Sequence, residues 1–361
     1  MEQREAMFRG CLLGMAVGDA MGYPIDRKSW EEIAEDYGPN GLLGYDLANG
    51  SAEITSYTQI AAFVGNSLLM GLIRGNPEKY SRYVALGLRE WAKSQQFRGG
   101  AEKTYCWLAQ VPEMRRRYCM ETSVLDALSR DTLGSPEAPK FRFSSPSVLT
   151  AAVAVGLLYD PEKLDLKQVG RLGAEAVAFT HGDPETFLSG AILAYTVTSL
   201  LQRPERPMAE HFLTAAEMAQ VQFKDTYPQV EKVTALLKKA IALTKDPEIS
   251  PLVAMFLLEC VSASECLAGA AYACIVHAGN FDEGMITAVN HSGRSAAVGA
   301  ITGALLGLKL GVEALPDFYL ESLEQVGVLE ELAGDLSQGR QIMRVFDDSW
   351  DQKYVQGLPT R

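Results

Sequence analysis

A short polar stretch, EITSYTQ at positions 53–59, precedes the apolar run IAAFVGNSLL and has the residue types to bind an anion or serve a metal ion. The apolar residues recur at helical spacing, so a helix begins here with Thr55 or Ser56 as its N-cap. The first turn of a helix has N–H groups without intrahelical acceptors, which suits an anion or carboxylates that hold a metal. In this stretch, however, no acidic residue follows Glu53.

Helical periodicity dominates the chain that must position this stretch, and no run shows the strict alternation of a half-buried strand. We therefore expect an all-α protein with one helical domain over residues 1–361 and a core from about 7 to 340. The pattern predicts helices over 3–21, 29–36, 57–73, 77–94, 101–109, 121–129, 147–158, 166–180, 184–201, 207–219, 227–243, 249–260, 262–277, 281–289, 294–310, 315–332 and 335–345.

Two of these helices carry glycine at every fourth position. The glycines are Gly10, Gly14, Gly18 and Gly22 near the start and Gly299, Gly303, Gly307 and Gly311 near the end. Each costs about 1 kcal/mol of helix propensity relative to alanine, so a row of them needs a compensating gain. Glycines spaced by four lie along one face and let another backbone approach closely. We predict that both helices are central and that the start and end of the chain meet.

Composition and charge exclude several classes of function. The formal net charge of −12 opposes binding to phosphate backbones, so we expect no nucleic-acid partner. Six cysteines without a C-x-x-C pair favour reduced thiols in a cytosolic protein. The apolar run AAVGAITGALLGL is shorter than the roughly 20 residues needed to cross a bilayer, and the charged N-terminus is a poor signal peptide. We expect a cytoplasmic protein without a membrane segment.

Several motifs, in one order along the chain, resemble those of the ADP-ribosylglycohydrolase family. The opening GCLLGMAVGDAMGYPID resembles the family's first helix, which reads like GxLLGxAxGDALGxPxE, and TSYTQ resembles its Thr-Asp-Asp-Thr-Gln signature. Comparable strings follow: GPNG at 38–41, YDPEKL at 159–164, THGDP at 180–184 and AVNHSGRSAAVGAITGALLG at 288–307. The chain is identified as a divergent member of the dinitrogenase reductase-activating glycohydrolase type.

The resemblance implies an all-α orthogonal multi-helix bundle with two magnesium ions that hydrolyses the bond between ADP-ribose and a protein side chain. In the family the metal ligands come from the Thr-Asp-Asp turn and from a late Gly-Asp-Thr-Asp-Thr turn. Here Thr55 and Gly293 keep their places and Ser295 replaces a threonine, but all four carboxylates are missing. The substituted ligand positions carry Ser56, Tyr57, Arg294 and Ala296.

The loss of these acids bears directly on the metal. Mg²⁺ is held in proteins chiefly by carboxylate oxygens, and a two-metal centre needs them to offset four positive charges. A guanidinium about 5 Å from a divalent ion, at an effective dielectric constant of about 20, is repelled by roughly 6 kcal/mol. We therefore expect no magnesium cofactor and no metal site.

Arg294 itself has two interpretations. Its guanidinium could take the place of the metal and bind an anion, either a ligand phosphate or one of the carboxylates of Asp19, Asp26 and Asp183. Alternatively, it points to solvent at the start of a helix, although a cation is unfavourable beside the positive end of the helix dipole.

Other residues of the expected cleft also leave alternatives open. Asp26 stands where the family has an acidic residue near the scissile bond, and it could act as a general base or position water. It could equally cap the 38–41 region or face solvent. Asp19 lies on an apolar helix face, where buried structural hydrogen bonds are favoured over chemistry. His181 and Asp183 belong to the THGDP string, and the favoured interpretation is that they cap the next helix.

The resemblance leaves even nucleotide binding open, because Ala151 in SSPSVLTA stands where the family often has arginine beside the substrate. Three functions follow. The chain could be a degenerate member that binds ADP-ribose, an ADP-ribosylated protein or a related ligand. It could be a metal-independent glycohydrolase that uses Asp26. It could also be a structural or interaction protein with a vestigial cleft.

Overall fold

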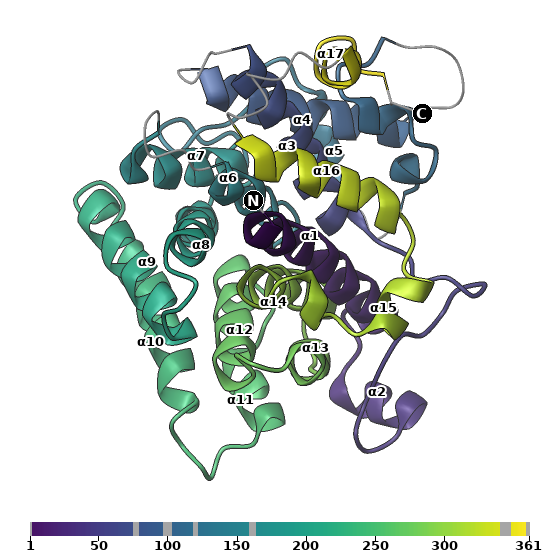
Figure 1. The fold of residues 1–361 in the computed structure, drawn as a ribbon. Helices are drawn as coiled ribbons and strands as arrows, with labels where there is room; N and C mark the ends of the chain where they lie inside the picture. The colour runs from purple at the N-terminus through teal and green to yellow at the C-terminus, as the bar shows by residue number, and fades with distance from the viewer. Residues whose placement is uncertain are drawn as a thin grey trace.

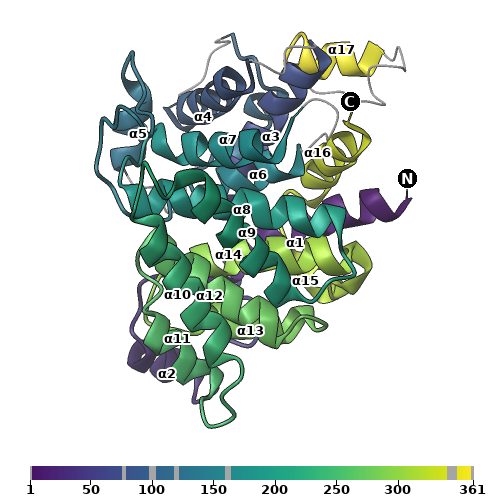
Figure 2. The ribbon, with the colours of Figure 1, turned by 90° about the vertical axis from the view of Figure 1, so that its left-hand side faces the viewer.

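The two glycine-bearing helices, α1 (Glu2–Gly22) and α14 (Ser295–Leu310), lie side by side at the centre of the computed structural model (Figure 1). The view turned by 90° again shows α1 and α14 in the middle of the molecule (Figure 2).

The structure describes residues 2–74, 79–96, 103–117, 122–158, 164–339 and 348–358. The other helices are α2 (Trp30–Tyr37), α3 (Ser56–Ile73), α4 (Tyr80–Gln96), α5 (Thr122–Ser129), α6 (Ala151–Leu157), α7 (Leu166–Ala178), α8 (Pro184–Gln202), α9 (Met208–Phe223), α10 (Val230–Leu243), α11 (Pro251–Leu258), α12 (Ala263–Val276), α13 (Phe281–Val289), α15 (Asp317–Ser322), α16 (Val326–Gln338) and α17 (Asp348–Tyr354).

The glycine rows of α1 and α14 interdigitate, as the spacing predicts. A Cβ atom on Gly14 would lie 2.3 Å from the carbonyl oxygen of Gly303, and one on Gly303 would lie 1.9 Å from that of Gly14. Gly10 meets Gly307 and Gly18 meets Gly299 in the same way, so the two helices run antiparallel. Backbone replaces side chain along the whole contact, which fixes the ends of the two helices relative to each other.

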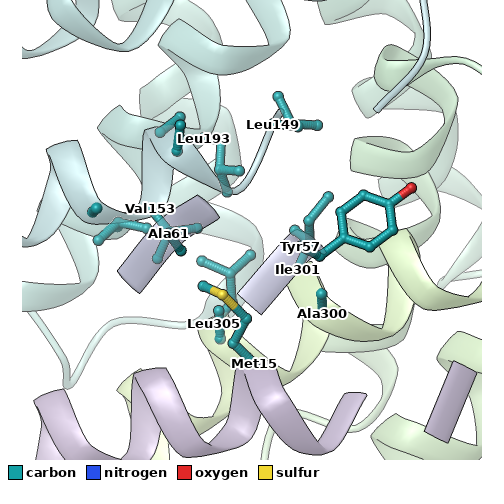
Figure 3. Packing of buried hydrophobic residues seen from close by; sticks show 14 of the residues in the cluster. Met15, Tyr57, Ala61, Leu149, Val153, Leu193, Ala300, Ile301 and Leu305 are labelled. Carbon is teal, nitrogen blue, oxygen red and sulfur yellow. The ribbon is translucent and has the colours of Figure 1, made fainter. Parts of the chain in front are cut away.

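Further helices pack around this central pair. α16 lies along α1, while α12 and α13 pack on α14. Figure 3 shows Met15 of α1 and Ile301 and Leu305 of α14 packed with Ala61 of α3 and Val153 of α6. Polar caps set several helix starts; capping boxes begin at Ser29, Asp165 and Ser262.

The all-α prediction is confirmed, since the described residues contain no strand beyond two isolated bridges, Ala48–Ser51 and Ala52–Leu323. None of the described helices is both long and apolar enough to cross a membrane. Short 3-10 helices complete the fold: η1 (Tyr23–Ile25), η3 (Trp107–Gln110), η4 (Glu113–Arg115) and η5 (Val312–Ala314).

Three predicted helices differ from the structure. The described part of 101–109 holds only η3, because Trp107 and Leu108 are buried there without a longer amphipathic repeat. The predicted helix 315–332 is two helices, α15 and α16, broken where Ala52 donates its N–H to the Ser322 carbonyl and accepts from the Glu324 N–H. The predicted helix 335–345 is the end of α16, and its residues from 340 lie outside the described part, as do 159–163 of the YDPEKL motif.

Candidate ligand-binding site

The N-terminus of α14, one of the two central helices, lies against the N-terminus of α3, and these two helix starts carry the substituted motifs. α3 begins at Ser56 after its N-cap Thr55, whose side chain accepts the N–H of Tyr57 at 3.3 Å. α14 begins at Ser295, with Arg294 as an N-cap that makes no side-chain capping bond. The two helix starts are joined because Arg294 Nη2 donates to the hydroxyl of Tyr57 at 2.9 Å.

Tyr57 is amphipathic in this position. Its ring lies beside Ala300 and Ile301, and its hydroxyl points away from the apolar cluster (Figure 3). The residue is 1% exposed, so its hydroxyl needs a polar partner, and Arg294 provides one. The buried ring of Tyr57 is what helical periodicity predicts for a core residue. The hydroxyl of its side chain takes part in the site by accepting the hydrogen bond from Arg294.

Asp19 of α1 holds the start of α3. Its carboxylate accepts the N–H groups of Thr55 and Thr58 at 2.8 and 3.1 Å and both of their hydroxyls at 2.6 Å. Burial raises the pKa of this carboxyl to about 6, although the four hydrogen bonds act in the opposite direction. The predicted structural role of Asp19 is confirmed by these contacts.

Asp26 holds the start of α14 in a corresponding way. Its Oδ1 accepts the N–H of Ala296 at 3.1 Å, and its Oδ2 lies 3.5 Å from Nε of Arg294. The side chains of Asp26 and Arg294 are 3% and 9% exposed, so this is a buried ion pair. The interpretations in which Arg294 or Asp26 faces solvent are therefore wrong. Directly after the 38–41 region, the side chain of Asn290 bonds the backbone N–H and carbonyl of Leu42.

Asp183 has a different role from Asp19 and Asp26. It is the N-cap of α8, where one carboxylate oxygen accepts both the N–H and the hydroxyl of Thr186. This confirms the capping interpretation for Asp183. His181 does not cap the helix; its Nδ1 and Nε2 lie 2.8 and 2.9 Å from the hydroxyls of Thr180 and Ser145.

The segment 144–151 borders the same site. Thr150 donates its hydroxyl hydrogen to the carbonyl of Tyr57 at 2.7 Å, and the carbonyl of Ser144 accepts from Ala263 at the start of α12. Ala151 is buried as the first residue of α6. Sequence reasoning did not detect the Ser145–His181 contact, because nothing in their spacing links the two residues.

The donor set at the substituted positions does not fit two magnesium ions. Ser56 and Ala296 are buried, and Ser295 donates to the carbonyl of His291. The carboxylates of Asp19 and Asp26, which contact the two helix starts, accept hydrogen bonds from backbone N–H groups, and Asp26 is paired with a guanidinium. Across the part of the chain that the structure describes, no three His, Cys, Asp or Glu side chains lie together as metal ligands.

Three non-glycine residues near the loop before α14 have a strained backbone conformation. Arg27, Glu259 and Cys260 have positive φ angles of 69°, 62° and 56°. The N–H of Arg27 donates to the carbonyl of Gly293 at 2.9 Å, and the N–H of Arg294 donates to that of Cys260 at 2.8 Å. Non-glycine residues rarely adopt this conformation, and such residues concentrate at functional sites.

A cavity of about 400 Å³ opens beside the first helix. It is lined by Ala20, Tyr23 and Pro24, by residues 46–48 and by Glu53, which precedes the α3 start. The approach to α3 is itself fixed, because Glu324 accepts the N–H of Ile54 at 2.9 Å. Burial raises the pKa of Glu324 to about 7.

These features define the class: an all-α protein in which two facing helix starts form a buried polar site. A family model described as ADP-ribosylglycohydrolase matches residues 1–344, and the chain belongs to that family.

Two further comparisons also cover more than nine tenths of the chain. An uncharacterised protein of Archaeoglobus fulgidus is 27% identical over 346 residues, covering 92% of this chain and 96% of the relative. A solved chain described as an ADP-ribosylglycohydrolase-related protein complex shares the fold, with a TM-score of 0.57 and 22% identity over 94% of this chain and 100% of the other.

Proposed function

We propose that this protein is a member of the family that does not assemble the two-magnesium centre and acts by binding ADP-ribose, an ADP-ribosylated protein or a related ligand. One observation carries the proposal: the guanidinium of Arg294 lies between Tyr57 and Asp26, which joins the two helix starts through side chains. In the family these helix starts supply the metal ligands.

Electrostatics supports the absence of the metals. A divalent ion about 5 Å from this guanidinium is repelled by roughly 6 kcal/mol at an effective dielectric constant of about 20. The substituted positions supply a phenol, a serine hydroxyl and a methyl group in place of carboxylates, and Mg²⁺ binds these poorly.

The buried position of Asp26 argues against metal-independent hydrolysis. A general base must reach the proton that it removes, within hydrogen-bond distance or through one water. Asp26 is 3% exposed at its side chain, and its oxygens are engaged by the Ala296 N–H and by Arg294. We infer a structural and electrostatic role for this carboxylate.

Retained strain and an open cavity favour ligand binding over a purely structural role. Left-handed backbone at Arg27, Glu259 and Cys260 costs on the order of 1 to 3 kcal/mol per residue, and a cleft without function gives no reason to keep it. The neighbouring cavity of about 400 Å³ is large enough for part of a nucleotide sugar.

Thermal unfolding with ADP-ribose, in EDTA and in Mg²⁺, tests the proposal. A ligand at 100 times its dissociation constant adds about 2.7 kcal/mol of stability, and we expect the same shift with and without the metal. Hydrolysis of ADP-ribosyl-arginine should stay at the background rate. Magnesium-dependent turnover would refute the loss of the metal centre, and no shift with ADP-ribose or an ADP-ribosylated peptide would refute the binding role.

A further inference from the structure

We propose that exposed apolar side chains at α11 and the acidic face of α2 form a docking surface for the polypeptide part of an ADP-ribosylated protein. The partner that fits is a positively charged polypeptide segment with apolar side chains. This inference deepens the proposed function and rests on it, because it names which of the proposed ligands the protein binds. The docking surface consists of Glu31, Glu35, Val253, Phe256, Leu257 and Val261.

α11 exposes apolar side chains that a helix of its composition normally buries. Its sequence, PLVAMFLL, has no polar side chain, yet only Ala254, Met255 and Leu258 are buried. Large apolar side chains are exposed between residues 253 and 261: Val253 at 44%, Phe256 at 75%, Leu257 at 37% and Val261 at 54%. No other described stretch of that length exposes more than two such side chains. Apolar patches of this kind mark interaction sites.

The loop before α14, residues 290–294, contacts the start of α2 and the segment that follows α11. The N–H of Trp30, the first residue of α2, donates to the Ser292 hydroxyl at 2.7 Å. The N–H of Arg294 donates at 2.8 Å to the carbonyl of Cys260, which lies just after α11. Both views place α2 and α11 in the lower part of the molecule (Figure 1, Figure 2). A polypeptide that contacts both helices therefore lies beside the segment that carries Arg294.

α2 carries negative charge that does not stabilise the helix itself. Its sequence, WEEIAEDY, has four acids and no base. Glu35 and Asp36 lie in its last turn, where the helix dipole favours cations. Asp36 pairs with Lys28 at 2.7 Å, whereas Glu31 and Glu35 are exposed and have no cationic partner among the described residues. A positively charged partner would offset this charge.

Charge favours a foreign polypeptide over a second copy of this chain as the occupant. The formal net charge of −12 opposes self-association, and like charges brought together at an interface are costly. A segment with lysine or arginine beside apolar residues is attracted to α2 and covers the exposed side chains of α11. Its position beside Arg294 allows it to present an attached ADP-ribose to the candidate site.

Fluorescence anisotropy with a peptide that is ADP-ribosylated at a central arginine and has leucine and lysine around it tests the assignment. The comparison ligands are free ADP-ribose, the same peptide without the modification, and a modified peptide with serine and aspartate in place of leucine and lysine. We expect the wild type to bind the modified leucine–lysine peptide at least tenfold more tightly than any of the three. Added salt should reduce this advantage.

The apolar half of the docking surface is tested with F256S. The variant should bind the modified leucine–lysine peptide at least tenfold more weakly than the wild type, with unchanged affinity for free ADP-ribose and an unchanged melting temperature. V221S on α9 is the matched control, because Val221 is 82% exposed and lies outside the docking surface. It should bind the peptide as the wild type does.

The acidic half is tested with E31K/E35K. Charge reversal should remove the preference for the leucine–lysine peptide over the serine–aspartate peptide and leave the affinity for free ADP-ribose unchanged. E210K/E217K, which reverses two exposed acids of α9, is the matched control and should keep the preference.

The outcomes separate this inference from the proposed function. If the wild type binds ADP-ribose and both docking variants bind the modified peptide as the wild type does, the docking surface is overturned and the proposed function stands. If the leucine–lysine peptide binds through Phe256 and attached ADP-ribose adds no affinity, the surface stands and the proposed function fails. A dimer in sedimentation velocity that F256S dissociates would make a second copy the occupant and overturn the inference.

Discussion

Arg294 donates a hydrogen bond to the hydroxyl of Tyr57 across 2.9 Å, and this contact joins the N-terminus of α14 to that of α3. Asp26, which directly follows η1, completes the arrangement by pairing with Arg294. In the family motifs that these two segments resemble, both helix starts carry acids that hold metal ions. Here a fixed cation and a phenol make the connection instead.

Removal of Arg294 should destabilise the fold. R294M leaves the carboxylate of Asp26 buried without its buried counter-charge, and we expect a loss of about 3 kcal/mol in the free energy of unfolding measured in urea. The double variant D26N/R294M should lose less than R294M alone. R130M, which breaks an exposed pair with Asp126, should change stability by no more than about 0.5 kcal/mol. Equal effects of R294M and R130M would contradict the buried pair.

Restoration of the acids should create a magnesium site. In the variant S56D/Y57D/R294D/A296D, four carboxylates replace the guanidinium and the neutral groups, and we expect measurable Mg²⁺ binding by calorimetry. The matched asparagine variant at the same four positions keeps similar side-chain shapes without charge and should bind no metal. Absence of Mg²⁺ uptake by a folded aspartate variant would mean that the two helix starts are displaced as well.

Substitution of a glycine in the central contact should be severe. A Cβ on Gly303 would lie 1.9 Å from a backbone oxygen of Gly14, and backbone cannot move aside as a side chain can. We expect G303A to lose more than about 3 kcal/mol in thermal or urea unfolding. A Cβ on Gly327 in α16 would meet no atom within 4 Å, so G327A should gain up to about 1 kcal/mol. A mild G303A variant would show that the two helices can separate.

The stability should fall in mild acid because of a buried histidine. Burial lowers the pKa of His291 to about 4 from 6.5, so between these pH values the unfolded chain binds more protons than the folded one. The free energy of unfolding therefore decreases as the pH drops from 6.5 to 4, by about 3 kcal/mol in total from this residue.

Comparison with H291Q isolates this effect. Glutamine retains a donor for the Ala288 carbonyl, which the histidine Nε2 contacts at 3.1 Å, but it does not titrate. The difference between wild type and variant should change across pH 4 to 6.5 and be constant above it. Asp19 has the opposite slope between about 3.8 and 6, since burial raises its pKa, and it cancels in this difference. Parallel pH profiles would contradict the assignment.

The sequence contains most of the fold and part of the site. Glycine at every fourth position was sufficient to predict that α1 and α14 meet. Each glycine lowers helix propensity, and close packing of two helix backbones is the gain that offsets this loss. The loss of the four family carboxylates could also be read from the sequence. What could not be predicted is the choice of Asp26 over Asp19 and Asp183 as the partner of Arg294, since short-range sequence patterns do not distinguish the three carboxylates as long-range partners.

Arg27 shows a different limit of sequence reasoning. It directly follows Asp26, has a φ angle of 69°, and donates its N–H to the carbonyl of Gly293, 266 residues further along the chain. Short-range patterns do not contain that contact. The Ser145–His181 contact was missed for the same reason.

The glycine contact between α1 and α14 also shapes how the chain is made. α1 ends at Gly22 and its partner starts at Ser295, so a ribosome working at about 5 to 20 residues per second needs roughly 15 to 55 s to deliver the second helix. During that time α1 has no surface on which to bury its bare glycine face. The newborn protein can therefore pair its two central helices only late in synthesis, and a chain released before residue 295 lacks the partner of α1.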